Sequence, residues 1–427
     1  SRRSLLSKLQ TRLTPLSLLT YFHCSVFFII YDVCFSQLDR LTLVLLITLF
    51  ILKIIFLFRH NIDATTDRTN FRKKGGILVP YCLPDKYNSS HEYCFYSHDV
   101  IASFIGFLEK NKLISTTHEF DDAAKMKEFA KVGKENAFDW LEDQGYQKEL
   151  SEFVMKNIFI ALIADFCHFT YEALRCSEKG KIAVTYCLLR KPLKENLFYL
   201  EWMLAYPEEF INRFMHQEAE EYVIDKVNPH QKKEIIRKAS EVSETSNINV
   251  DGFLYELRYD KASDLGYESL WNKATHLVTT FKHIRTEEQN LNFVFARTTE
   301  IASLWEYMYR TLPLLLYHAA GTVTSLAERI FGFDEELKRY NRLFRDLKFL
   351  TYNSSRLGNE SHLELYEGLP LFCSSCRELR VLELADIKTF AGSSSWTCQK
   401  CGKVNMISSY CFSIGEGFSL IEPSDLG

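Results

Sequence analysis

A nearly uninterrupted apolar run close to the start of the chain constrains its architecture most. Residues 41–58 read LTLVLLITLFILKIIFLF, eighteen residues with a single charge at Lys53. A second apolar stretch, residues 16–35, precedes it and contains Asp32. Each approaches the roughly 20 residues that a helix needs to cross a hydrocarbon core. Because only SQLDR separates the two stretches, the sequence predicts a two-helix transmembrane hairpin over residues 1–60.

Basic residues flank this hairpin on its two outer sides. The turn between the spans holds only Asp39 and Arg40. The residues before the first span and after the second are richer in cations: Arg2, Arg3, Lys8, Arg12, Arg59, Arg68, Arg72, Lys73 and Lys74. The positive-inside rule therefore predicts that both ends are cytoplasmic. We expect the rest of the chain to lie in a reducing compartment, where paired cysteines bind metals rather than form disulfides.

The two charges within the apolar stretches have two interpretations. Asp32 and Lys53 are pore candidates, because charged residues inside a membrane often line an ion pathway. Alternatively, both side chains snorkel to the lipid headgroups. Two helices cannot enclose an aqueous path by themselves, so a channel would require self-association into a homo-oligomer.

Helical periodicity dominates residues 98–358 and predicts a large helical cytosolic domain. The turn-rich residues 61–97 are predicted to form a juxtamembrane connector of loop and short strand. We expect Pro192 to kink or end one helix and Pro313 to interrupt another. Four residues in and after the connector are candidates for a second metal site: Cys82, His91, Cys94 and His98. Their spacing fits no common metal site closely, and the alternative is that they are ordinary packing residues.

The net charge of the whole chain is only −4, so any site for an anionic ligand must be formed by a local group of cations. One cationic cluster surrounds Pro192, and a second lies near residue 283. Their members are the candidate ligand-binding residues: Arg175, Arg190, Lys191, Lys194, Lys282, His283 and Arg285. A kinked helix beside cations suits a phosphate group. The alternative is that these cations face solvent or pair with nearby Glu residues.

Four cysteines near the C-terminus form the most specific motif in the chain. Cys373, Cys376, Cys398 and Cys401 have the spacing C-x2-C-x21-C-x2-C. Two such pairs can supply four thiolates to a tetrahedral Zn²⁺ ion. The intervening residues alternate apolar and polar, which predicts a small zinc ribbon with β-strands over residues 359–427. Its charges are mixed, which favours a structural or subunit-joining role over nucleic-acid binding.

Searches for catalytic motifs give no strong candidate. The sequence contains no phosphate-binding Gly-x-x-x-x-Gly-Lys loop, no Gly-x-Ser-x-Gly elbow and no His-Glu-x-x-His helix. We therefore predict that the chain is not an enzyme.

The helical domain resembles the HEPN class, most clearly at residues 172–201, EALRCSEKGKIAVTYCLLRKPLKENLFYLE. This resemblance implies a helical fold used for binding and dimerisation. Many HEPN domains are RNases with an Arg followed after four to six residues by His. The match in this chain is Arg356 and His362, in a predicted loop. A membrane-tethered HEPN RNase is therefore the enzymatic alternative, and a non-catalytic membrane scaffold is a third possibility.

The whole layout, a membrane hairpin followed by a mainly α cytosolic domain and a zinc ribbon, resembles membrane effectors of bacterial anti-phage defence. Among these it is similar to the channel component of Hailong-type systems. The resemblance implies a ligand-gated channel or pore in the bacterial inner membrane. It also implies regulation by a nucleotide or DNA oligomer from a partner nucleotidyltransferase.

Overall fold

The chain divides into two compact units, Ser1–Leu78 and Val79–Gly427. The computed structural model describes residues of the second unit alone: 83–113, 120, 122–132, 136–263, 266–280, 282, 285–292, 298–357, 367–368, 370–373, 375–381, 383–387, 395–406 and 410. The predicted hairpin, with Asp32 and Lys53, lies outside these residues, as does Cys82. In the part of the chain that the structure describes, no helix combines the length and apolar composition that a bilayer crossing requires.

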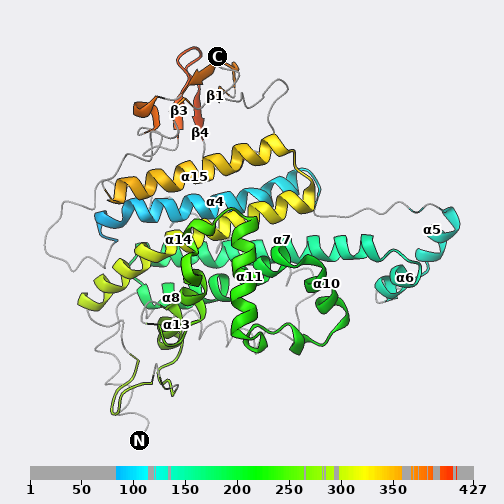
Figure 1. The fold of residues 1–427 in the computed structure, drawn as a ribbon, viewed down its shortest axis with the longest axis horizontal. Coiled ribbons are helices and arrows are strands. Elements are labelled where there is room, and N and C mark those ends of the chain that lie inside the picture. The colour runs from blue at the N-terminus through cyan, green and yellow to red at the C-terminus, as the bar shows by residue number, and fades with distance from the viewer. Residues whose placement is uncertain are drawn as a thin grey trace, which may run out of the picture. The chain divides into compact units, whose positions relative to one another are not determined.

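The second unit is mainly helical, as the sequence predicts (Figure 1). Its described α-helices are α4 (Asn88–Lys110), α5 (Ala123–Phe129), α6 (Ala137–Asp143), α7 (Gln147–Glu178), α8 (Ile182–Arg190), α9 (Leu197–Ala205), α10 (Pro207–His216), α11 (Pro229–Val242), α12 (Phe253–Tyr259), α13 (Tyr267–Thr275), α14 (Thr298–Phe331) and α15 (Glu335–Leu357). A π-helical segment, η4 (Lys191–Asn196), joins α8 to α9. Between α11 and α12 lie two short 3₁₀ turns, η7 (Ser246–Ile248) and η8 (Val250–Gly252).

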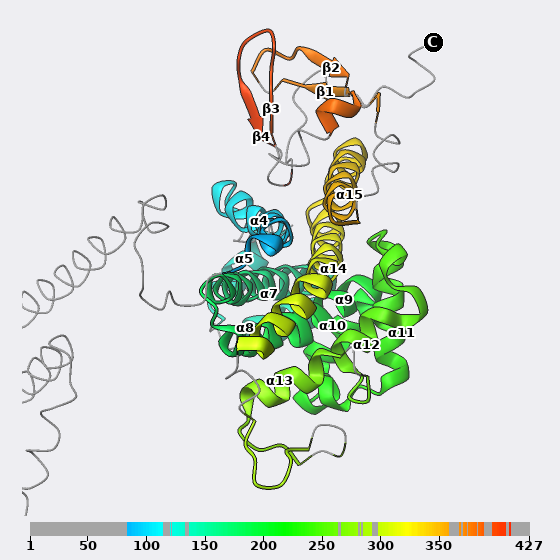
Figure 2. The same cartoon turned by 90° about the vertical axis from the view of Figure 1, so that its left-hand side faces the viewer.

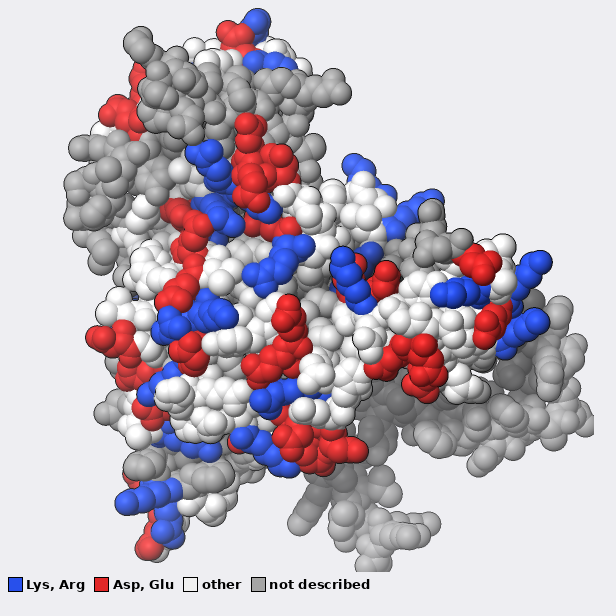
Figure 3. Space-filling model, turned by 45° about the vertical axis from the view of Figure 1, so that its right-hand side comes forward, with Lys and Arg blue, Asp and Glu red and all other residues white. Residues whose placement is uncertain are grey.

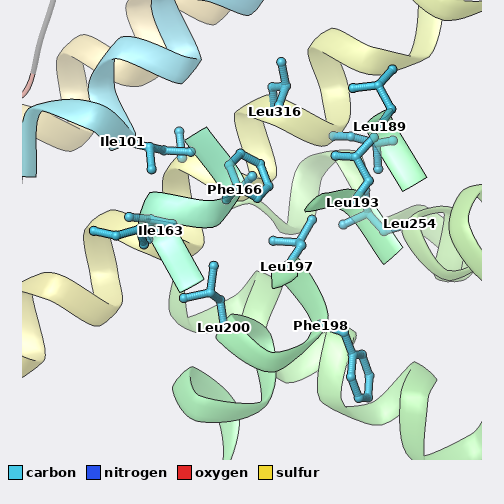
Figure 4. Close-up of a cluster of buried hydrophobic side chains, with 14 of the residues drawn as sticks. Ile101, Ile163, Phe166, Leu189, Leu193, Leu197, Phe198, Leu200, Leu254 and Leu316 are labelled. Atoms are coloured by element: carbon cyan, nitrogen blue, oxygen red, sulfur yellow. The ribbon is translucent and has the colours of Figure 1, made fainter. Parts of the chain in front are cut away.

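The long helices α4, α7, α14 and α15 pack as one group, and α9 to α12 lie to one side of it (Figure 2). Helix α4 contacts α7, α14 and α15, while α9 contacts α11, α14 and η4. Completely buried side chains from several of these helices meet in the core shown in Figure 4: Ile101, Ile163, Phe166, Leu189, Leu197, Leu200 and Leu316. Burying a side chain of this size stabilises a fold by about 1.5–3 kcal/mol.

Helix α4 begins ten residues before the predicted start of the helical domain, within the predicted connector. In the first part of α4, several of the residues that face the core are polar. The sequence therefore lacks the regular spacing of apolar residues that predicts a helix. Buried His91 contacts the Tyr309 hydroxyl through Nδ1 at 2.7 Å. Ser97 donates a hydrogen bond to the Tyr93 carbonyl within the same helix. Polar groups satisfied in this way can occupy core positions at little cost.

The predicted interruption at Pro313 is wrong, because α14 continues through that residue. Proline removes one donor, which leaves the carbonyl of Tyr309, four residues earlier, without its usual helical partner. The Tyr352 hydroxyl of α15 lies 3.4 Å from that carbonyl oxygen and replaces the missing donor. A contact between helices therefore compensates for the proline.

Pro192 lies where the α-helix α8 gives way to a π-helical segment, which agrees with the predicted kink or end of a helix. The α-helical pattern ends at Arg190, and η4 follows with Leu197 donating its N–H to the carbonyl of Pro192. The wider π-helical turn leaves two carbonyls available to side chains. Arg258 donates to the Leu193 carbonyl, and the Tyr259 hydroxyl donates to that of Lys194.

The C-terminal region contains two antiparallel hairpins. Strand β1 (Pro370–Phe372) pairs with β2 (Leu379–Val381), and β3 (Ser395–Thr397) pairs with β4 (Val404–Met406). Each hairpin carries one Cys-x-x-Cys pair between its strands. This arrangement agrees with the predicted ribbon in its strands and in the placement of its cysteines.

Candidate metal centre and buried polar network

The four predicted cysteine ligands come together at the tips of the two hairpins. One sulfur atom from each residue takes part, and all four lie within 4.8 Å of one another. The Sγ atoms of Cys373 and Cys401 are 3.5 Å apart, and those of Cys376 and Cys398 are 3.6 Å apart. A tetrahedral ion with metal–sulfur bonds of about 2.3 Å requires sulfur separations of about 3.8 Å. The cluster could therefore hold a metal ion with little movement.

The backbone of the two hairpin tips repeats the same geometry. The N–H of Cys373 donates to the Glu378 carbonyl at 3.0 Å, and that of Cys398 donates to the Lys403 carbonyl at 2.8 Å. The residue after each second cysteine has a positive φ, 60° at Arg377 and 70° at Gly402. This turn directs backbone N–H groups inwards. N–H groups of Cys376 and Ser375 lower the pKa of the Cys373 thiol, whereas contacts with the neighbouring thiols raise the pKa of Cys376, so Cys373 is the first of the two to form a thiolate.

The candidate ligand-binding cations around Pro192 all have acidic partners. Arg175 pairs with Glu178, Arg190 with Glu195 at 3.5 Å, and Lys191 with Asp165 at 2.8 Å. Lys194 is buried and lies 2.9 Å from buried Glu268. The first three pairs are partly exposed, so an anionic ligand could replace an acidic partner. Lys194 is different, because removing its charge would leave Glu268 buried without a counterion.

The second cationic cluster lies in the loop between α13 and α14. The Asn292 side chain donates to the His276 carbonyl at 2.7 Å, and the N–H of Thr286 donates to the Thr279 carbonyl at 2.8 Å. These bonds fix the base of the loop. Lys282 and Arg285 are exposed on it, and among the described residues neither forms an ion pair. His283 lies outside the described residues.

The residues suggested for a second metal are packing residues as far as the structure describes them. Cys94 is completely buried in α4, and His91 contacts Tyr309. His98 lies 2.8 Å from Asp99 through Nδ1. Among the described residues, the cysteine set at residues 373–401 is the one group arranged for a metal ion.

A polar network in the centre of the helical body has no local signal in the sequence. Glu201, Arg258 and His318 come from α9, α12 and α14, and each side chain is completely inaccessible to solvent. Arg258 Nη2 donates to both carboxylate oxygens of Glu201, at 2.6 and 2.8 Å. His318 Nε2 lies 2.7 Å from Glu201 Oε1. Arg258 and His318 together give the buried carboxylate three close contacts, which satisfy most of its polar capacity.

The buried position of His318 favours its neutral form. Burial lowers the pKa of His318, although the neighbouring Glu201 carboxylate acts in the opposite direction. Burial would raise the pKa of Glu201, but Arg258 and His318 hold it below its ordinary value. His318 is thus neutral and donates from Nε2 to Glu201. Its Nδ1 accepts from the Thr245 hydroxyl at 2.8 Å, and Thr245 contacts the Ser243 hydroxyl at 2.9 Å.

The hydroxyl–His–Glu chain resembles a catalytic arrangement in its connectivity, but its position prevents access to a substrate. Ser243, Thr245, Glu201 and His318 all have no exposed surface. The backbone of α14 lies close to the side chains of Thr245 and Arg345 at Gly321. A Cβ added to Gly321 would be 2.7 Å from Thr245 and 2.9 Å from Arg345. The network therefore fixes how α9, α12 and α14 pack.

Acidification from pH 7 to pH 5 is expected to destabilise the helical body by about 1–2 kcal/mol through His318. The unfolded histidine binds a proton below its ordinary pKa of 6.5, whereas buried His318 has a lowered pKa and stays neutral. The contribution of neutral His318 to the free energy of unfolding is therefore fully present above pH 6.5 and decreases below it. Urea unfolding followed by the fluorescence of buried Trp202 and Trp271 measures the effect.

The matched variants in this test are His318→Gln and His230→Gln. The first should reduce the difference in stability between pH 7 and pH 5, leaving the contribution of buried His91, whose pKa burial also lowers. The second alters an exposed histidine and should leave the difference unchanged. Equal pH dependence in wild type and His318→Gln would contradict a neutral His318.

Charges on the visible face of the body do not separate by sign. Figure 3 shows Lys and Arg interspersed with Asp and Glu over this face. A surface of this kind lacks the continuous basic patch that a nucleic-acid backbone prefers. Recognition of an anion on this face would require a local group of cations.

Comparisons with protein-family models, curated proteins and solved structures found no match to this chain.

Proposed function

We propose that this chain is a homo-oligomeric membrane channel or pore whose predicted hairpin, residues 1–60, forms the conducting part. The division of the chain between Leu78 and Val79 is the observation that carries the proposal. Both long apolar stretches precede this boundary. The described body follows it and has a complete core of its own. A body that folds around its own core can control a membrane segment without contributing to it.

The ligand in this proposal is anionic, a nucleotide or DNA oligomer. Lys282 and Arg285 support its placement on the loop between α13 and α14, because both are exposed and carry no acidic partner among the described residues. The paired cations near Pro192 would first have to give up Asp165 or Glu195. We therefore assign initial contact with the ligand to the loop, and Arg190 and Lys191 to a second, weaker contribution.

The remaining parts of the proposal follow from the resemblance in layout. The cysteine cluster holds Zn²⁺ in a structural role, consistent with four sulfur ligands at near-tetrahedral separations. The protein acts in the bacterial inner membrane during anti-phage defence, and a partner nucleotidyltransferase supplies the oligomer.

Ion flux from liposomes containing the purified full chain tests the channel directly. We expect flux that depends on an added nucleotide or DNA oligomer, together with an oligomeric particle in detergent. Deletion of residues 1–60 should abolish flux while preserving the fluorescence of Trp202 and Trp271. A monomeric particle that gives no flux with any oligomer tested would contradict the proposal.

Binding of a fluorescent DNA oligomer tests the site on the loop. The variant Lys282→Glu/Arg285→Glu should bind about tenfold more weakly and lose less affinity as salt rises, because fewer phosphate contacts remain. Lys127→Glu/Lys131→Glu changes two exposed lysines of the α5 region and is the matched control. Equal affinities in the two variants would remove the loop from the site.

One observation favours the RNase alternative. Arg356 lies in the last turn of α15 rather than in the predicted loop, so the first residue of the Arg–His motif is helical. His362 lies outside the described residues. A membrane-tethered RNase should cleave RNA without residues 1–60 and lose activity in His362→Ala but not in His230→Ala. A channel shows the opposite dependence on the hairpin.

A further inference from the structure

Tyr410, which follows β4 in the sequence, packs against the core of the helical body. It lies four residues beyond β4, which ends at Met406. Despite this position near a chain terminus, only 5% of Tyr410 is exposed. Its ring centroid lies 4.5 Å from that of Phe104 in α4 and 5.8 Å from that of Phe333, which follows α14. The ring therefore covers the place where the ends of two core helices meet.

The hydroxyl of Tyr410 completes a polar cluster under this ring. It donates to Glu328 Oε1 at 2.9 Å, and Glu328 is itself buried. The other carboxylate oxygen of Glu328 accepts from Arg342 of α15 at 3.4 Å, and Arg342 also pairs with Glu244. Burial raises the pKa of Glu328, although Tyr410 and Arg342 both act to lower it. Loss of Tyr410 would leave this buried carboxyl group with one partner fewer.

The cysteine cluster precedes Tyr410 by only nine residues in the sequence. Both hairpins and the four cysteines lie between the end of α15 at Leu357 and Tyr410 in the sequence. The hairpins have strands of only three residues, and Leu379, Val381 and Val404 are more than 40% exposed. Such a module depends on its metal for folding. If it unfolds, Leu357 and Tyr410 are joined by a longer flexible stretch of chain, and the entropy of loop closure then opposes the seating of Tyr410.

We propose that the ribbon is a metal-dependent latch on the helical body. Metal binding at the four cysteines orders the hairpins, and the ordered hairpins hold Tyr410 on Phe104, Phe333 and Glu328. Metal loss releases Tyr410, uncovers the two phenylalanines and loosens the adjoining ends of α4 and α14. The metal centre thereby sets the state of a surface on the helical body.

Amide hydrogen exchange on the full chain in detergent tests the latch. Residues 104–110 and 328–331 should exchange about tenfold faster after chelation of the metal, because local opening no longer has to displace a buried aromatic side chain. Tyr410→Ala should give the same increase in metal-loaded protein. In metal-free protein Tyr410→Ala should add less than about twofold, since the two changes act on one contact.

Two further variants separate the latch from general damage. Tyr410→Phe keeps the ring but not the hydroxyl, so its exchange should lie between those of wild type and Tyr410→Ala, and only in the metal-loaded protein. Tyr171→Ala removes a tyrosine of α7 that is 43% exposed and should leave exchange at these two sites unchanged. Unaltered exchange after chelation would overturn the proposal, as would full additivity of chelation and Tyr410→Ala. None of these outcomes depends on channel activity.

Discussion

Removal of the metal from the four-cysteine cluster is expected to unfold residues 370–406 while the core of the helical body stays folded. The two hairpins have strands of three residues each, and apolar side chains on β2 and β4 are exposed rather than packed. A module with so little core derives much of its folding free energy from the metal. The helical body is different, because it contains dozens of buried apolar side chains contributed by several of its helices.

Metal analysis and thiol titration measure this effect together. The wild-type chain should bind one metal ion, and chelation should make four additional thiols reactive. Cys398→Ser/Cys401→Ser should bind no metal and show rapid amide exchange over residues 370–406. Cys176→Ser is the control, since this partly buried cysteine of α7 lies outside the cluster. Protection of the hairpin amides that persists in the metal-free chain would contradict a metal-dependent fold.

The four-cysteine cluster could be predicted from the sequence because its information is local. Each Cys-x-x-Cys pair defines half of the site within four residues, and the hairpins only need to bring two halves together. Helix positions were also largely predictable, since periodicity is a short-range signal. The start of α4 could not be predicted from periodicity, because its signal is not local. Its core-facing His91 and Ser97 are polar, and their partners lie on α14 or in the backbone.

The partners of charged residues could not be predicted in the same way. Lys194 lies 74 positions from Glu268 in the sequence, and Glu201 lies 57 positions from Arg258 and 117 from His318. Each residue taken alone resembles an ordinary polar residue on a helix surface. The π-helical segment at Pro192 links the two groups, because Arg258 donates to the carbonyl of Leu193 within it. Pro192 predicts a departure from the α-helix there, but only the packing shows that Arg258 and Tyr259 donate to the carbonyls that this departure leaves free.

Replacing Arg258 with methionine is expected to destabilise the helical body by roughly 3–5 kcal/mol, the usual cost of removing one partner of a buried ion pair. The variant leaves the Glu201 carboxylate buried with His318 as its remaining side-chain donor. It also removes the donors that Arg258 supplies to the carbonyls of Leu193 and Leu254. Arg258→Lys should rescue little, because one ammonium group cannot reproduce the planar arrangement of donors.

The double variant Glu201→Met/Arg258→Met distinguishes a buried charge from a simple loss of packing. It removes both charges, so it should be more stable than Arg258→Met alone, although the carbonyl of Leu193 still loses a donor. Arg237→Met is the matched surface control. Arg237 pairs with Glu234 and Glu241 on α11 but is half exposed, so its loss should change stability little. Urea unfolding monitored through Trp202 and Trp271 compares all four proteins. If Arg258→Met and Arg237→Met were equally stable, the network would not be what fixes the packing of α9, α12 and α14.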